Sequence, residues 1–230
     1  MKKNYLSVLL IVLITALVFM IIATYFKKPV VVTNQSYINF IGDEYVVDSS
    51  DYLVAHKELI GLPLEDISTD EKESLLRMRE EEKLARDLYT VLYDTWGANI
   101  FRNISKSEAT HTEAVRYLIK RYSLIDPVQD ETIGVFSDDE LSKLYSQLVL
   151  KGKESLESAF WVGALVEDMD IYDLNNFVEE VDNQDINIVY QNLLSGSINH
   201  MRAFVRQLDK MGQAYSPQYI SEDDFQEIIY

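Results

Sequence analysis

Four long stretches of the chain repeat apolar residues every three or four positions, and this pattern constrains the fold more than any other feature. Such stripes predict amphipathic α-helices that bury one face in a shared core. Glycine and proline, with 8 and 4 residues, are too sparse for a turn-rich sandwich or barrel. The predicted long helices cover residues 70–95, 103–122, 154–179 and 183–211.

The predicted helical domain covers residues 68–212. It begins at Ser68, an N-cap residue with Glu71 three positions later, and ends at Gly212. The long connection between the second and third helices contains a shorter predicted helix at 137–151. Two antiparallel helix pairs joined by one long crossover are the layout of ferritin-like bundles. We therefore expect an all-α, ferritin-like four-helix bundle, followed by an acidic C-terminal tail at 213–230.

Residues 1–28 predict an N-terminal transmembrane anchor with flanking lysines. The run from Tyr5 to Phe26 carries no charge, and as a helix it would span roughly 33 Å, enough to cross the hydrocarbon core. A cleavable signal peptide is the alternative, but its apolar region is usually shorter and no small-x-small site follows the run. The flanking charges are nearly balanced and weakly favour a domain outside the cytoplasm. We expect a single-pass membrane protein in which residues 29–67 are a tether.

Composition excludes several classes of site. The chain has no cysteine, so thiolate zinc sites, iron–sulfur clusters and cysteine nucleophiles are ruled out. Residues 1–42 hold 4 lysines and no acid, which leaves 17 basic and 38 acidic residues in the remainder, a net charge of −21. A domain this acidic repels phosphate backbones, so nucleic acid is not an expected partner.

Each long stripe is apolar at both ends and polar near its middle. A carboxylate in a low-dielectric core must be paired, protonated or bound to a cation. Because the interruptions fall at mid-length, a bundle would bring them to one level. Carboxylates and imidazoles gathered there could coordinate iron, manganese or zinc, and a carboxylate could bridge two ions. The interrupting residues are Glu82, Glu108, His111, Glu167, Ser197 and His200.

Glu108 and His111 strengthen this interpretation because they form a Glu-x-x-His pair. Positions three apart lie on the same face of a helix, so both side chains would point into the core. The equivalent pair in the fourth predicted helix is Ser197 with His200.

Four segments together resemble a ferritin-like family of archaea and bacteria that is classed as a domain of unknown function. The resemblance covers about residues 60–222 and implies a ferritin-like fold with a di-iron site, but no established reaction. The segments are Met78-Arg-Glu-Glu-Glu-Lys-Leu-Ala-Arg-Asp87, Ser107-Glu-Ala-Thr-His111, Val162-Gly-Ala-Leu-Val-Glu-Asp-Met-Asp-Ile171 and Ser195-Gly-Ser-Ile-Asn-His200.

The chain departs at Ser197 from the pattern of well-characterised ferritin-like di-iron proteins, whose fourth helix carries glutamate at this place. Asp170 could supply the missing ligand, so the site could be a complete two-metal centre, a single-metal site or a relic. Glu81 is a rival to Glu82 as the ligand from the first helix. The predicted metal ligands are Glu82, Glu108, His111, Glu167, Asp170 and His200.

The sequence supports two alternative hypotheses for the function, one enzymatic and one not. The first is a redox enzyme whose di-iron or manganese centre oxidises Fe(II) or reduces oxygen or peroxide, with no catalytic residue assigned. The second is a non-catalytic helical interaction or structural module with a degenerate metal site. The expected partners are the membrane, metal ions and, as an option, a second copy of the chain in a homodimer.

Overall fold

The structure is a computed structural model that describes residues 40–41, 44–45, 59 and 61–230. The predicted anchor and most of the predicted tether lie outside these residues. In the part of the chain that is described, no helix is both long enough and apolar enough to span a bilayer. Strands β1 (Phe40–Ile41) and β2 (Glu44–Tyr45) form a short antiparallel pair, and the rest of the regular structure there is helical.

The helices agree with the all-α prediction and with its order of elements. The four long ones are α3 (Thr69–Trp96), α4 (Asn99–Arg121), α6 (Leu156–Glu180) and α7 (Gln184–Lys210). The short helix of the crossover is α5 (Asp139–Gly152), and α8 (Glu222–Ile229) lies in the segment predicted only as an acidic tail.

Helix α3 begins and ends where local chemistry requires. The Ser68 hydroxyl accepts a hydrogen bond from Glu71 N at 3.1 Å, and the Glu71 carboxylate accepts one from Ser68 N at 2.9 Å. This capping box satisfies amide groups that a helix N-terminus leaves without partners. At the other end Gly97 adopts φ 64°, a left-handed conformation that favours glycine and terminates the helix.

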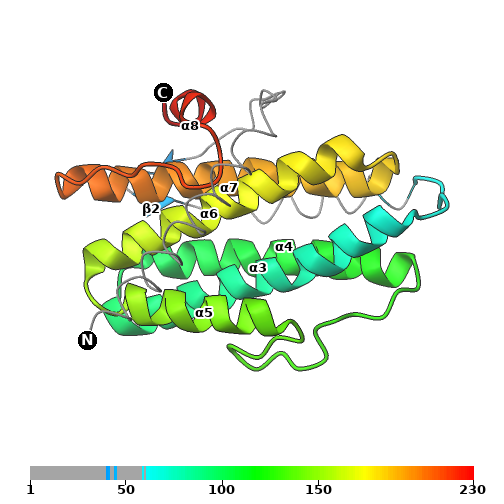
Figure 1. Cartoon of the computed structure of the whole chain (residues 1–230), viewed down its shortest axis with the longest axis horizontal. Coiled ribbons are helices and arrows are strands. Elements are labelled where there is room, and N and C mark those ends of the chain that lie inside the picture. Colours follow the sequence, from blue (N-terminus) through cyan, green and yellow to red (C-terminus); the bar gives the residue numbers. More distant parts are fainter. Residues whose placement is uncertain (1–39, 42–43, 46–58, 60) are drawn as a thin grey trace, which may run out of the picture. The chain divides into compact units, whose positions relative to one another are not determined.

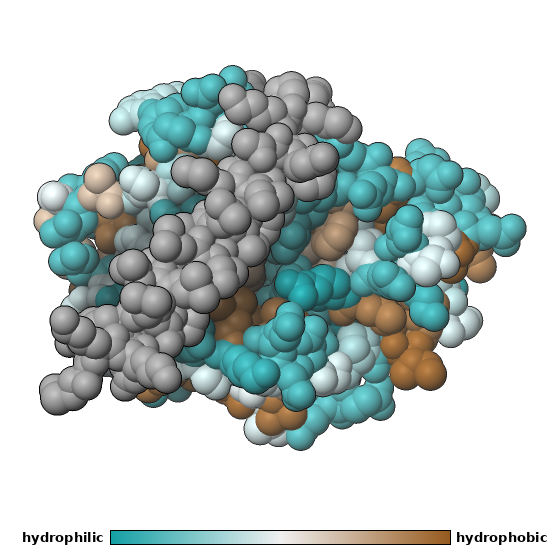
Figure 2. All heavy atoms as spheres, in the orientation of Figure 1, coloured by the Kyte–Doolittle hydropathy of each residue, from teal (hydrophilic) through white to brown (hydrophobic). Residues whose placement is uncertain are grey.

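The four long helices pack side by side around one apolar core (Figure 1). Helix α3 packs along α4, and α6 packs along α7, while α3 with α6 and α4 with α7 complete the arrangement. Helix α5 lies against both α3 and α6. The coloured surface in Figure 2 is mostly hydrophilic on the face shown, in keeping with the excess of acids.

Charged residues of α3 hold the crossover segment in place. Arg79 Nε lies 3.2 Å from both Asp126 oxygens, and Lys83 Nζ donates to Thr132 O at 2.9 Å and to Asp87 at 2.5 Å. Arg79 and Lys83 are fully buried, which is tolerable only because their charges are paired. The charges of α3 around Glu82 therefore anchor a segment that has no helical period of its own.

One buried carboxylate binds the C-terminal segment through several hydrogen bonds. Asp168 accepts hydrogen bonds from the Tyr215 hydroxyl at 2.8 Å and from the backbone amides of Gln218, Tyr219 and Ile220. Helix α8 then buries Phe225 and Ile228 against the rest of the core. The predicted tail is thus a packed part of the structure.

Candidate metal centre

The polar interruptions of the four stripes meet inside the helical core. Glu82 comes from α3, Glu108 and His111 from α4, Glu167 from α6 and His200 from α7. The three carboxylate residues and His200 are at most 2% exposed, and the His111 side chain is 12% exposed. These side chains reach one level because each follows the buried stripe of its own helix.

Glu108 is the residue that joins the two halves of this cluster. Its Oε2 lies 2.7 Å from His111 Nδ1, and its Oε1 lies 2.7 Å from His200 Nδ1. Glu82 Oε2 lies 3.3 Å from His111 Nδ1, and Glu167 Oε2 lies 3.4 Å from His200 Nδ1. The imidazole rings themselves are stacked with centroids 5.7 Å apart.

Two potential ligand groups result, and they share Glu108. One consists of Glu82, Glu108 and His111, and the other of Glu108, Glu167 and His200. Within each group the ligand atoms all lie within 4.8 Å of one another. Either group could therefore hold a metal ion, with one Glu108 oxygen directed to each.

Two buried carboxylate oxygens of the cluster lack a hydrogen-bond donor, which suits them to bind a cation. Glu82 Oε1 and Glu108 Oε1 are buried and accept no hydrogen bond, although the second atom lies close to an imidazole nitrogen. A buried acceptor without a donor costs about 1–3 kcal/mol, and more when it is charged. Oxygen and imidazole donors of this kind suit iron, manganese or zinc.

Two neighbouring residues shape the site without belonging to either group. The Tyr89 hydroxyl donates to Glu167 Oε1 at 2.5 Å, and its ring packs against Phe204. Gly196 lies against the imidazole of His111, and a Cβ added there would come within 2.6 Å of ring atom Cε1. A larger residue at 196 would displace that ring. Periodicity gave no signal for Gly196, since a glycine within a helical stripe reads only as a weak helix former.

Asp170, the predicted substitute ligand, lies next to Ser197. The Ser197 hydroxyl is hydrogen-bonded to the Asp170 carboxyl, and Oγ also lies 3.0 Å from Leu193 O. Asp170 nevertheless belongs to neither ligand group. Glu81 also lies apart from both, because its carboxylate pairs with Arg77.

The carboxyl groups in and beside the cluster differ in the direction in which their pKa is shifted. Burial raises the pKa of Glu82 to about 8, against the opposing attraction of His111. Burial and the charges of Glu82 and Glu167 hold the pKa of Asp170 well above its usual range. Burial would also raise the pKa of Glu108, but the two imidazoles outweigh it and lower that pKa below the ordinary value.

The pKa values of His111 and Glu167 are also shifted. Burial alone would lower the pKa of His111, but the carboxylates of Glu82 and Glu108 raise it well above its ordinary value. Burial raises the pKa of Glu167, with His200 opposing. Without metal, the cluster thus holds protons on several groups that could otherwise bind a cation.

Residues 71–230, which include all six predicted ligands, match a family model described as uncharacterized protein domain (DUF2202). The chain belongs to this family. The DUF2202 chain is 53% identical over 168 residues to the uncharacterized protein MJ0754 of Methanocaldococcus jannaschii, a match that covers 73% of this chain and 91% of the relative. The crystal structure of that hypothetical protein aligns with a TM-score of 0.72 over 74% of this chain and 97% of its own.

Proposed function

We propose that this DUF2202 protein is a ferritin-like protein that holds two transition-metal ions, iron in the first place, in the core of its helical domain. The observation that carries the proposal is the position of Glu108 between two imidazoles, with one carboxylate oxygen toward each. A shared carboxylate with a separate histidine on either side is the arrangement expected for two neighbouring cations.

The proposed ligands divide between the ions in the same way as the two groups. Glu82, Glu108 and His111 would hold one ion, and Glu108, Glu167 and His200 the other. Asp170 is the further carboxylate that could join them, since the Ser197 hydroxyl at the equivalent place on α7 is a weak ligand.

The ferritin-like assignment is supported by the pattern of donors along the four long helices. Ferritin-like carboxylate proteins take one glutamate from each of two helices and a Glu-x-x-His pair from each of the other two. Here Glu82 and Glu167 supply the single glutamates, Glu108 with His111 supplies one pair, and His200 supplies half of the second pair.

Bound iron or manganese would supply electron transfer, and the proposed reaction class is oxidation of Fe(II) with reduction of oxygen or peroxide. The chain itself contributes a dry, shaped site. The apolar stripes above and below the cluster exclude bulk water, which strengthens the interaction of each carboxylate with a cation. Tyr89 holds one oxygen of Glu167, and Ser197 holds the carboxyl of Asp170. These hydrogen bonds orient the acidic groups before a cation arrives.

We further propose that the domain is tethered to a membrane by residues 1–28 and faces the outside of the cytoplasm. The support for this is the uncharged apolar run of the sequence, which lies outside the described residues. Fractionation of cells that express the full-length chain, followed by protease treatment of intact cells, would test both statements.

Elemental analysis of the full-length chain tests the metal site. The protein is expressed with iron supplied, purified in mild detergent and analysed beside Glu108→Gln. The wild type is expected to hold about two ions per chain, and Glu108→Gln to lose both, because a single amide oxygen cannot serve two cations. Glu113→Gln is the matched control, since Glu113 lies on the same helix with an exposed side chain.

Wild-type protein without stoichiometric metal would refute the proposal and leave the buried polar cluster as a structural feature of the core. Where metal is present, anaerobic Fe(II) mixed with oxygen or peroxide tests the reaction class. The wild type should then oxidise Fe(II) faster than Glu108→Gln, and equal rates would refute the catalytic part alone.

A further inference from the structure

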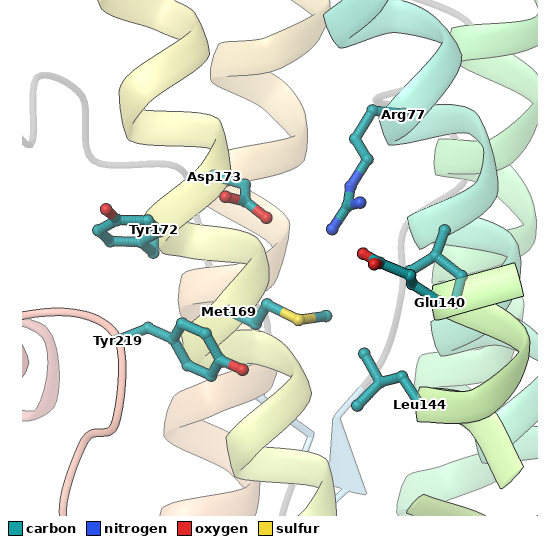
Figure 3. A pocket seen from close by; sticks show the side chains of 8 residues that line it. Arg77, Glu140, Leu144, Met169, Tyr172, Asp173 and Tyr219 are labelled. Atoms are coloured by element: carbon teal, nitrogen blue, oxygen red, sulfur yellow. The ribbon is translucent and has the colours of Figure 1, made fainter. Parts of the chain in front are cut away.

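A cavity of about 310 Å³ opens on the side of α3 that faces α5 and α6 (Figure 3). Arg77 from α3 and Asp173 from α6 face each other across it, and Glu140 from α5 lies on the side of Arg77. Tyr219 of the C-terminal segment forms part of the wall. One water molecule needs about 10–15 Å³ of cavity volume, so a cavity of about 310 Å³ has room for a hydrated ion.

A buried carboxylate lies directly behind the charged residues of this cavity. Glu81 pairs with Arg77 through Oε1, and the Asp173 carboxyl lies close enough for its charge to act on Glu81. The Glu81 side chain is only 2% exposed, and its Oε2 accepts no hydrogen bond. A buried carboxylate oxygen without a donor has an unmet demand for a proton or a cation.

The same two helices continue from this carboxylate to the candidate metal centre. Glu82 follows Glu81 in α3 and belongs to the ligand group of His111. Asp170 precedes Asp173 by three residues in α6 and therefore lies on the same face, one turn closer to the centre. Asp170 keeps some exposed surface, unlike Glu82. Carboxylates thus line the α3–α6 boundary from the cavity to the cluster.

We infer that this cavity is the entry port through which divalent cations reach the metal centre, with Glu81 and Asp173 as transit carboxylates and Arg77 as the gate. The inference rests on the proposed function, because a port has meaning only if the centre holds metal. Acidic side chains in a confined, low-dielectric opening concentrate cations and increase their rate of entry.

Arg77 suits a gate because, among the described residues, its guanidinium has one close ion-pair partner, Glu81. It pairs with Glu81, whereas its distance to the Asp138 carboxylate is 4.0 Å, and 40% of its side chain is exposed. A long, flexible side chain in that position can leave the carboxylate when a divalent cation competes for it. Neutralising Arg77 therefore leaves the port more attractive to cations.

The test measures the rate of metal uptake separately from the final metal content. Full-length, metal-free protein is mixed anaerobically with Fe²⁺ alone, quenched at intervals with excess chelator, desalted and analysed for iron. The variants are Glu81→Gln, Asp173→Asn and Arg77→Gln. Asp94→Asn is the charge-matched control, since Asp94 is exposed and lies about 25 Å from Arg77 along the same helix.

Glu81→Gln and Asp173→Asn are expected to slow uptake by about fivefold or more while reaching the wild-type iron content. Arg77→Gln is expected to speed it, and Asp94→Asn to leave it unchanged. Wild-type rates in both carboxylate variants would overturn the port. A lower final iron content in Glu81→Gln would also overturn it, because Glu81 would then be a ligand. Failure of the wild type to take up iron would instead refute the proposed function itself.

Discussion

The metal-free protein should become less stable as the pH rises from about 5 to 8. Burial raises the pKa of Glu81 and of Glu82 from 4.5 to about 8, so the native state holds protons that the unfolded chain releases. The stability that such a group contributes is complete below its ordinary pKa and is lost as the pH rises through the native value. The raised pKa of His111 acts in the same direction, and the lowered pKa of Glu108 matters only in acid.

The size of the effect follows from proton counting. Between pH 4.5 and 8 each group holds about one more proton in the native state than in the unfolded chain. The free energy of unfolding then falls by about 1.4 kcal/mol per pH unit for each group. Over the whole interval one group accounts for at most about 5 kcal/mol, comparable with the total stability of a marginal domain.

Urea unfolding of the chelator-treated full-length chain at pH 5.5, 6.5 and 7.5 measures this slope. Glu82→Gln carries no charge at any of these pH values, so its slope should be shallower than the wild type by about 1.4 kcal/mol per pH unit. Glu113→Gln, with an exposed side chain, should keep the wild-type slope. A wild-type stability that stays level or rises between pH 5.5 and 7.5 would refute the raised pKa values of Glu81 and Glu82.

Three further substitutions test other contacts. Gly196→Ala should displace the His111 ring, since the added Cβ would lie 2.6 Å from it, and elemental analysis should find about half of the wild-type iron. Asp168→Asn presents an amide donor where two carboxylate oxygens accept, and should cost about 2–3 kcal/mol in urea unfolding and expose residues 213–230 to limited proteolysis. Lys83→Met removes one of the two ion-pair partners of buried Asp87, the other being Arg86, and should cost about 3 kcal/mol, part of which an added Asp87→Leu substitution restores in thermal unfolding.

The long helices could be predicted because their signal is local and repeated. A stripe such as that of α4 runs over several turns, and the capping residues Ser68 and Glu71 mark the start of α3. The same periodicity brought Glu82, Glu108 and Glu167 to one level, since a residue on the buried stripe must face the partner helices. The rivalry between Glu81 and Glu82 is decided by the structure, because Glu81 lies about 100° away round the helix and meets Arg77.

The features that could not be predicted depend on segments whose apolar residues do not repeat at a regular spacing. Residues 122–138 carry no apolar repeat, so nothing local indicates that Arg79 and Lys83 would be buried beneath them. Helix α8 is only 8 residues long, and its two buried side chains are too few for a stripe. The role of Asp168 depends on a turn near Tyr219 that folds back onto α6, a contact between positions about fifty residues apart.

The serine of α7 explains the asymmetry of the cluster. With Ser197 in the first position of its pair, α7 offers an imidazole but no carboxylate, so His200 meets the carboxylates of α4 and α6 instead. Glu108 therefore serves both imidazoles, and its pKa is the one that falls while those of Glu82 and Glu167 rise. The Ser197 hydroxyl binds the Asp170 carboxyl, which keeps a further acid next to the position where a glutamate was expected. A two-metal centre at this cluster would depend on Glu108 more than on any other side chain, which is why Glu108→Gln separates a two-metal site from a merely polar core.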